Sequence, residues 1–358
     1  TPCGTLFPYT TLFRSLTREP AGRPRPSPSP HGTPMAAQTW DLSTFRSGLF
    51  AHDAQRIVDL WNRAARDLHG FFPLTRSLFV RRVVRAACFR PEHLLVARAG
   101  PRIVGMLHRQ TVEEPYYTPA GVVEMVLVDP DFRRQGIADA LLGQALSCFV
   151  AEGVGLVDGF GAWPYSPFYA TLIDGSERSG VFLDCEGLLG LFRKHGFRHA
   201  RESLVMRCNL ADDLPALPER LASQPERTRV QWTVRQAPGT WLDFVFRGWR
   251  LYEHTLSDPR GVLLSRAITA RMDGLSDHAG REFRAVFGVN TPEAVRGQGW
   301  ATVNLHRLLA RLRADGAAEA ELHVYADNEP AVRLYRRLGF DTVARTVALR
   351  WTGGNPAA

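Results

Sequence analysis

The chain has 358 residues, of which 45% are hydrophobic and 22% are charged, and its formal net charge is +8 at pH 7. This length allows two or three domains with complete cores, and the composition is typical of a water-soluble globular protein. No apolar run approaches the ~20 residues of a membrane-spanning helix, and the arginines are interspersed with acids, so neither a membrane partner nor a nucleic-acid partner is predicted.

The first 34 residues are not expected to belong to a fold. Residues 23–34 alternate proline with serine and arginine, a composition that cannot bury a core. Residues 5–15, TLFPYTTLFRS, look like the translation of a sequencing-adapter oligonucleotide; a natural disordered leader or transit peptide is the alternative. We therefore expect the native chain to start at Met35 and treat 1–34 as a disordered leader or a non-native translated sequence.

The next segment predicts helices followed by a hairpin and a strand. Apolar residues at helical spacing predict amphipathic helices over residues 52–68 and 74–89. Residues 94–107 read as two short strands around a Gly-Pro turn. Residues 122–128 are apolar and β-branched, which is typical of a buried strand. This strand leads into residues 133–138 (RRQGIA), and a helical stripe begins at Ile137.

The same plan repeats after a linker. Residues 211–228 hold three prolines among polar residues and predict an interdomain linker. Residues 251–272 predict a hairpin, and residues 283–289 predict a strand that leads into residues 296–301 (RGQGWA). A further strand at 321–325 and a helix at 331–338, with Gly339 as its C-cap, complete the second copy.

A second motif follows each glycine turn. Residues 191–197 read LFRKHGF in the first copy, and residues 334–340 read LYRRLGF in the second. The two motifs recur in the same order, which indicates a duplicated domain. The first copy has 20 more residues between its motifs, around 163–184, a segment rich in aromatic residues that includes Trp163 and Tyr165. It is either a loop that covers the first site or a passive surface excursion.

Each glycine turn predicts a site for a phosphate-bearing ligand. A strand–turn–helix leaves the first N–H groups of the helix unpaired, and the peptide dipoles favour an anion there. Gly136 and Gly299 remove the side chain that would block a phosphate, and the turn arginines add charge-assisted bonds. The sequence contains neither a P-loop nor a dinucleotide-binding glycine motif, which argues against an NTPase and a dehydrogenase.

The five cysteines, Cys3, Cys88, Cys148, Cys185 and Cys208, have no paired spacing. This pattern argues against a zinc site and against a disulfide framework. We therefore expect no metal and a reducing, cytoplasmic location.

The two motifs together resemble those of the GCN5-related N-acetyltransferase (GNAT) superfamily, over residues 38–352 and in two copies. The resemblance implies an α/β fold with a mixed sheet of the α+β kind. It implies two tandem acyl-CoA N-acyltransferase domains, at residues 35–210 and 229–358, joined by the linker at 211–228. It also implies acetyl-CoA as cosubstrate and direct transfer of the acetyl group to an amine in a ternary complex.

The resemblance further implies which residues hold acetyl-CoA. The pyrophosphate would lie on two turns, made of Arg133, Arg134, Gln135, Gly136, Ile137 and Ala138 in the first copy and of Arg296, Gly297, Gln298, Gly299, Trp300 and Ala301 in the second. The pantetheine would pair with two strand edges, Val126, Leu127 and Val128 in the first copy and Phe287, Gly288 and Val289 in the second. Asn328 matches a residue that contacts the cofactor near the thioester.

Tyr335 matches the usual general acid of the family. A phenol suits this role because a departing thiolate has an ordinary pKa of about 8.5 and takes up a proton as the C–S bond breaks. In the first copy Phe192 stands at the corresponding position and Cys185 corresponds to Asn328. Because phenylalanine donates no proton, we expect the second copy to be the catalyst and the first to be degenerate.

The general base is less well defined by the sequence. Glu124 lies on the strand before the first turn, where several family members place this acid, and a solvent-facing or ion-paired glutamate is the alternative. In the second copy, Glu293 and His323 are weaker candidates. An acceptor that arrives as a neutral amine, or a water relay, would need no dedicated base.

We therefore predict an acyl-CoA-dependent N-acetyltransferase that acts on a small-molecule amine or a peptide. One alternative is a non-catalytic acyl-CoA-binding or regulatory protein. Another places catalysis in the first copy, with Glu124 as base and Tyr169 supplying the hydroxyl group.

Overall fold

The computed structural model describes residues 39–48, 52–66, 68, 71–112, 120–160, 168–169, 172, 175–177, 179–235 and 250–353. The predicted leader at 1–34, Trp163 and Tyr165 lie outside these residues. Within them, no helix is long and apolar enough to cross a membrane. The same residues contain no group of three or more His, Cys, Asp or Glu side chains placed to hold a metal ion.

The first copy contains seven strands and four α-helices within the described residues. Its strands are β1 (Asp41–Thr44), β2 (Leu94–Ala99), β3 (Arg102–Val112), β4 (Ala120–Val128), β5 (Val157–Gly159), β6 (Val181–Phe182) and β7 (Arg198–Asn209). Its helices are α1 (Asp53–Ala64), α2 (Arg76–Phe79), α3 (Ile137–Ala151) and α4 (Glu186–Lys194). The chain continues from α2 into a π-helical turn at Val80–Val84.

The second copy follows a short linker helix, α5 (Glu219–Ala222). Its strands are β8 (Arg229–Arg235), β9 (Leu251–Ser257), β10 (Leu263–Arg271), β11 (Phe283–Asn290), β12 (Glu319–Tyr325) and β13 (Asp341–Trp351). Its described helices are α7 (Asp273–Ala279), α8 (Trp300–Ala314) and α9 (Glu329–Arg337).

Across the described residues the strands form one thirteen-stranded sheet in the order β1-β2-β3-β4-β5-β13-β7-β12-β11-β10-β9-β8, with β6 paired to β13 outside this path. The pairs β4–β5 and β11–β12 are parallel, and the other described pairs are antiparallel. This is the mixed α/β sheet that the sequence predicted.

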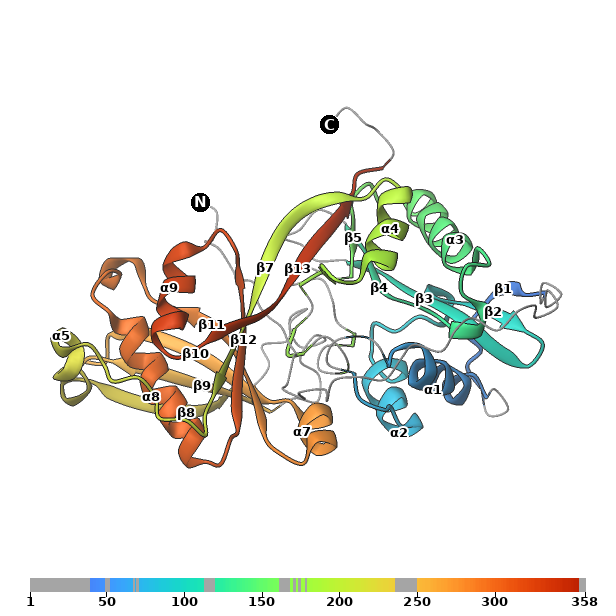
Figure 1. Ribbon diagram of the computed structural model, residues 1–358. Helices are drawn as coiled ribbons and strands as arrows, with labels where there is room; N and C mark the ends of the chain where they lie inside the picture. The colour runs from blue at the N-terminus through green and yellow to red at the C-terminus, as the bar shows by residue number, and fades with distance from the viewer. Residues whose placement is uncertain are drawn as a thin grey trace, which may run out of the picture.

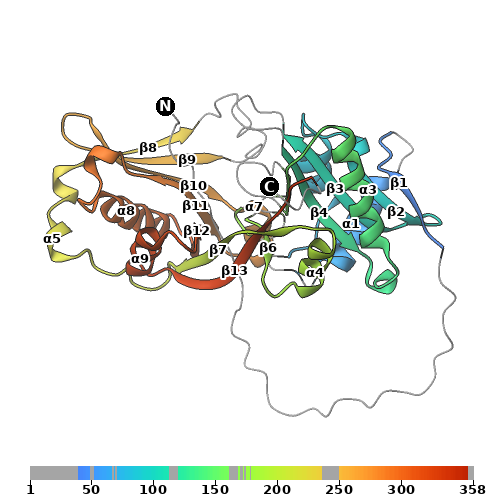
Figure 2. The same ribbon diagram turned by 90° about the horizontal axis from the view of Figure 1, so that it is seen from above.

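The two copies exchange their last strands. β7, the last strand of the first copy, pairs with β12 of the second from Glu319↔Asn209 to Tyr325↔Ser203. β13, the last strand of the second copy, pairs with β5 of the first from Leu349↔Gly159 to Trp351↔Val157. β7 and β13 also pair with one another, and they run side by side between the two halves of the molecule (Figures 1 and 2).

The helices cover both faces of the sheet in the first copy. A Cβ atom on Gly105 of β3 would lie 2.5 Å from Ile137 of α3, so α3 packs directly on this face. Figure 1 shows α1 and α2 on the other side of β3 and β4, where Ile57, Leu60 and Trp61 of α1 are completely buried. In the second copy, α8 and α9 lie together on one face of β8–β12 (Figure 2).

Most predicted elements are confirmed, with shifted ends. The helix predicted at 52–68 is α1, and the one predicted at 74–89 is reduced to α2 and the π-helical turn. The predicted linker contains α5, whose Leu221 packs in a small cluster with Val303 of α8. The domain boundaries along the chain stay a prediction, because each copy shares its sheet with the last strand of the other.

Candidate active site

Each copy contains a pair of parallel strands that separate after three residues. In the second copy, β11 and β12 pair from Phe283↔Glu319 to Ala285↔Glu321 and no further. Beyond this point, among the described strands, β11 pairs only with β10, and β12 only with β7. In the first copy, β4 and β5 pair from Gly121↔Val157 to Val123↔Gly159. We call the opening between β4 and β5 the first splay and the opening between β11 and β12 the second splay.

The predicted pantetheine edges lie on the strands that border these splays. Val126, Leu127 and Val128 pair with β3 on one side, and no described strand pairs with their other edge. In the second copy, Phe287 pairs with Ile268 of β10 on one side, and no described strand pairs with its other edge. Gly288 adopts φ 61, a conformation that L side chains rarely adopt. Both edges therefore keep backbone groups directed into the splay.

Both glycine turns have the predicted geometry. Gly136 (φ 81) precedes α3, Gly299 (φ 87) precedes α8, and neither helix start has a side-chain cap. Two residues earlier, Arg134 (φ 63) and Gly297 (φ 77) are also left-handed. The N–H groups of each first turn are thus available to an anion.

The arginine that begins each turn fixes it to the preceding strand region. Arg133 Nε donates to the carbonyl oxygen of Val128 at 3.3 Å, and Arg296 Nε donates to that of Thr291 at 3.1 Å. These two arginines support the turn, and they contribute positive charge beside it. The glutamines of the two turns have different hydrogen-bond partners. The side chain of Gln135 donates to the carbonyl oxygen of Asp131, whereas the side-chain oxygen of Gln298 accepts from Nε1 of Trp300.

A cavity of about 360 Å³ lies at the second turn. Four arginines line it, together with the turn and the start of α9: Arg220, Arg296, Arg333 and Arg337. Leu221 of the linker covers one side of the turn, because a Cβ on Gly299 would lie 2.6 Å from its side chain. Four guanidinium groups around uncapped N–H groups fit a polyanion such as the phosphates of a nucleotide.

The first turn has a carboxylate where the second has none. Asp139, in the first turn of α3, lies 2.7 Å from Nζ of Lys194, the last residue of α4, and 3.1 Å from Nε2 of the next residue, His195. The hydrogen bond from Lys194 lowers the pKa of Asp139, so the carboxylate is ionised at neutral pH. Lys194 corresponds to Arg337 of the second copy. Asp139 therefore neutralises the positive charge of Lys194 and weakens the attraction of the first turn for phosphate.

Tyr335 of α9 is buried, with 3% of its surface exposed, and its ring meets that of Phe340 edge to face at 5.9 Å. Burial raises the pKa of Tyr335, and the nearby Glu177 raises it further. The phenol is therefore protonated throughout the neutral range, as a proton donor must be.

Asn328 is the N-cap of α9, and its side-chain oxygen accepts from the N–H of Ala331 at 3.4 Å. This bond satisfies one of the free donors at the helix start. A contact between Asn328 and the cofactor stays a prediction. In the first copy, Cys185 is the N-cap of α4 and its side chain makes no capping bond.

Phe192 occupies the place of Tyr335 in the first copy. Its ring packs directly on β5, because a Cβ on Gly159 would lie 2.9 Å from it. The rings of Phe160 and Phe197 meet it edge to face at 5.8 and 4.8 Å. An apolar aromatic cluster thus lies beside the first splay, at the position where the second copy has a phenol.

Aromatic side chains also fill the other face of the first copy. Tyr169 OH lies 2.9 Å from His108 Nδ1, and its ring stacks on that of Trp61 at 5.8 Å. Phe168 packs against His108 with ring centroids 4.4 Å apart. Burial lowers the pKa of His108 to about 3, so the ring is neutral. Glu124, which follows the last residue of β4 that pairs with β5, is completely buried as well.

The second splay has a group of acids that the sequence did not reveal. Glu321 accepts from the backbone N–H of Ser176 at 2.9 Å and from Arg207 Nη2 at 3.3 Å. Arg207 Nη1 also lies 2.6 Å from Glu319, and Glu177 is only 5% exposed. We call Glu177, Glu319, Glu321 and Arg207 the interdomain acid cluster.

Of the second-copy base candidates, His323 of β12 is buried and Glu293 is exposed on the turn after β11. One signal for Glu321 exists in the sequence, since Glu319, Glu321 and His323 alternate with apolar residues along one strand. No sequence signal connects Glu177 with β12, because the longer segment of the first copy and β12 are far apart in the chain and meet only in the folded protein.

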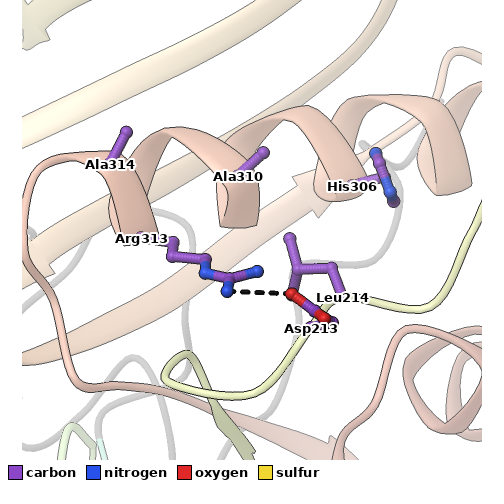
Figure 3. A pocket seen from close by; sticks show the side chains of 6 residues that line it. All are labelled: Asp213, Leu214, His306, Ala310, Arg313 and Ala314. Carbon is purple, nitrogen blue, oxygen red and sulfur yellow. Dashed lines mark hydrogen bonds and ion pairs between the residues drawn. The ribbon is translucent and has the colours of Figure 1, made fainter.

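A larger cavity, of about 610 Å³, lies elsewhere on α8 (Figure 3). Asp213 and Leu214 of the linker face His306, Ala310, Arg313 and Ala314 across it, and Arg313 pairs with Asp213 at 2.9 Å. It contains none of the predicted site residues, and its one ion pair is already satisfied.

The acetyltransferase (GNAT) family profile matches residues 223–340, and a second GNAT domain profile matches residues 90–199. The chain is 48% identical over 290 residues to the mycothiol acetyltransferase of Mycolicibacterium gilvum, covering 72% of this chain and 83% of that protein. It is 32% identical over 241 residues to the mycothiol acetyltransferase of Clavibacter sepedonicus, covering 64% and 73%.

Among solved structures, the fold is similar to that of a tandem GNAT protein from the clavulanic acid biosynthesis pathway. The TM-score is 0.61 at 17% identity, and the match covers 88% of this chain and 99% of that one. This likeness concerns the fold alone. Together with the sequence matches, it shows that the chain belongs to the GNAT family of acetyltransferases, as a tandem N-acetyltransferase.

Proposed function

We propose that the second copy transfers the acetyl group of acetyl-CoA, the cosubstrate of this family, to a primary amine, and that the amine is the unacetylated precursor of mycothiol. The name shared by the curated relatives supports this acceptor. The observation that carries the proposal is the difference between the copies. The second copy has a buried phenol, Tyr335, at the position where the first copy has Phe192, which packs on Gly159 beside the first splay.

The residues around the second turn would hold the phosphates of acetyl-CoA. The N–H groups at the start of α8 and the guanidinium groups of Arg333 and Arg337 provide donors from two helices. The free edge at Phe287–Val289 would pair with the pantetheine amides, which directs the thioester into the second splay.

Tyr335 would act on the leaving group. Its phenol is protonated at neutral pH, and it lies on the helix that borders the splay. Donation of its proton to the sulfur atom favours cleavage of the C–S bond. Burial also keeps bulk water away from this hydroxyl group, which limits hydrolysis of the thioester.

The first copy would be structural or would bind acetyl-CoA without turnover. Phe192 provides no proton, and Asp139 opposes a phosphate at the first turn. The alternative in which Glu124 and Tyr169 catalyse transfer there is disfavoured by the contacts of Tyr169. The Tyr169 hydroxyl group is already bonded to His108, deep among aromatic rings.

Two measurements on the full chain test the proposal. Calorimetric titration with acetyl-CoA gives affinity and stoichiometry, and loss of thioester absorbance with the mycothiol precursor gives turnover. We expect binding, turnover with the precursor, and none with its N-acetylated form. Binding without turnover on any primary amine would support a non-catalytic acyl-CoA-binding protein, and no binding at millimolar acetyl-CoA would remove the basis of the proposal.

A further inference from the structure

The longer segment of the first copy reaches the splay of the second. Phe168 and Tyr169 remain within the first copy, where they pack on His108 and Trp61. Only a few residues later, the backbone N–H of Ser176 donates to Glu321 of β12. Glu177 follows directly; burial and the charge of Glu321 raise its pKa, and the charge of Glu177 in turn raises the pKa of Tyr335. The segment of one copy is thus placed at the last residue of β12 that pairs with β11, where the splay of the other copy begins.

The direction of the side chains places Glu177 and Tyr335 on opposite sides of the sheet. Ala320 lies opposite Cys208 in the β12–β7 pair, and Cys208 contacts the backbone of Leu338 just after α9. The face of Ala320 is therefore the face that α9 covers. Glu321, the next residue, points to the other face, where Ser176 binds it. Glu321 is also the last residue of β12 that pairs with β11, so this face opens into the splay.

The charges of the interdomain acid cluster do not balance. Arg207 contacts both Glu319 and Glu321. Arg281, which is exposed at the surface, lies 2.7 Å from Glu319. Among the described residues, two arginines, Arg207 and Arg281, are thus available to three acidic side chains, those of Glu177, Glu319 and Glu321. Glu177 Oε2 has no hydrogen-bond partner there, although the side chain is 95% buried. A carboxylate without a partner in such a site strongly favours a bound cation or a proton.

A second buried group points to the same ligand. His323 lies two residues after Glu321 on β12, on the same face, and is 1% exposed. Neither of its ring nitrogens has a hydrogen-bond partner among the described residues. Burial lowers the pKa of His323, so the ring is neutral and offers an acceptor as well as a donor. The groups left without partners are those that an ammonium ion and a neighbouring hydroxyl group would satisfy.

We propose that Glu177 of the first copy completes the acceptor site of the second, where its carboxylate binds the ammonium group of the acceptor and removes one proton from it. The inference rests on the proposed function and adds to it the residue that receives the amine. The second copy has no acid on β11 itself at the splay, and the inserted segment of the first copy supplies one from outside.

The proton transfers balance. The acceptor arrives as R–NH3+, and Glu177 accepts one proton to give the neutral amine. The nitrogen lone pair forms a C–N bond at the thioester carbonyl carbon, and the C–S bond breaks. Tyr335 protonates the leaving sulfur, and the second proton lost by the nitrogen replaces the one that Tyr335 gave. The products are the amide and the free thiol, and Glu177 releases one proton to water.

The test compares Glu177→Gln with Glu186→Gln in the full chain. Glu186 is an exposed glutamate at the start of α4 and serves as the matched control. We expect Glu177→Gln to raise the KM for the mycothiol precursor by about 30-fold or more, as loss of a buried charge partner does. The KM for acetyl-CoA should change less than twofold, and Glu186→Gln should behave as the wild type.

Thermal unfolding separates a catalytic role from a structural one. Removal of a buried carboxylate without a partner should leave Tm unchanged or raise it. A lower Tm together with parallel losses for both substrates would overturn the inference, and so would a KM for the precursor equal to that of the wild type.

Calorimetric titration of the same precursor decides the inference independently of turnover. Binding to the wild type that is lost in Glu177→Gln supports it, even if transfer itself fails. Absence of binding to the wild type, or equal binding to both proteins, overturns it.

Discussion

Arg207 of β7 lies directly opposite Glu321 of β12, and its guanidinium group contacts both Glu321 and Glu319. The arginine belongs to the first copy, and both glutamates belong to the second. The strand pair that joins the copies therefore carries a buried ionic contact, next to the proposed acceptor site. Whether this buried ionic contact stabilises or destabilises the folded protein depends on how many of the carboxylates are ionised.

Glu321→Gln is expected to reduce the pH dependence of stability between about pH 4.5 and 7. Burial raises the pKa of Glu321 from its ordinary 4.5 to about 7. Between these values the folded chain binds more protons than the unfolded chain, so wild-type stability falls as pH rises. The contribution is roughly 3 kcal/mol at most. Urea unfolding at several pH values measures it, and a free energy of unfolding with equal pH slopes in both proteins would contradict it.

Tyr335→Phe should lower kcat by about 100-fold or more, because the leaving sulfur loses its proton donor. The affinity for acetyl-CoA should remain, since the hydroxyl group is not part of the phosphate cavity. Tyr252→Phe, on β9, is the matched control. Steady-state rates with the mycothiol precursor provide the measurement, and an unchanged kcat in Tyr335→Phe would remove this residue from the mechanism.

Arg337→Gln should weaken acetyl-CoA binding by about 10-fold or more, as expected for loss of a charge-assisted contact to phosphate. Arg336→Gln, the neighbouring position on α9, does not line the cavity and should bind as the wild type does. Calorimetry at low and high salt compares the two. Equal affinities for both variants would show that the phosphates lie elsewhere.

Asn328→Ala should destabilise the protein by about 1 kcal/mol, because the N–H of Ala331 loses its capping partner. Cys185→Ala, at the same position of α4, removes no capping bond and should have a smaller effect. Chemical denaturation compares the two variants. A larger loss of kcat than of stability in Asn328→Ala would indicate the additional cofactor contact that the sequence predicts.

Local patterns were sufficient to predict the turns and the helices after them. Gly136 and Gly299 precede helices in left-handed conformations, as strand–turn–helix motifs require. The helix that carries Tyr335 was also predicted, as was the difference between Phe192 and Tyr335 at corresponding positions. These features depend on residues a few positions apart, where backbone preferences and periodicity are informative.

Features that depend on distant residues were not predicted. Glu177 and Glu321 are 144 positions apart in the numbering, and the pairing of β13 with β5 connects residues even farther apart. Neither propensity nor periodicity encodes such pairings, because they follow from the packing of complete copies. The extra segment was expected to cover the first site or to be a passive excursion, and part of it instead contacts β12 of the second copy.

The exchange of β7 and β13 has a consequence for the history of the gene. A copy that does not itself catalyse transfer, as we propose for the first, would ordinarily be free to be deleted. Here the first copy still provides a central strand to the sheet of the second, and the second provides one in return. Deletion of either copy would leave an unpaired central strand exposed, a state prone to aggregation. We therefore expect neither copy to fold without the other, so that the first copy is required as part of the scaffold of the second whether or not it binds a ligand.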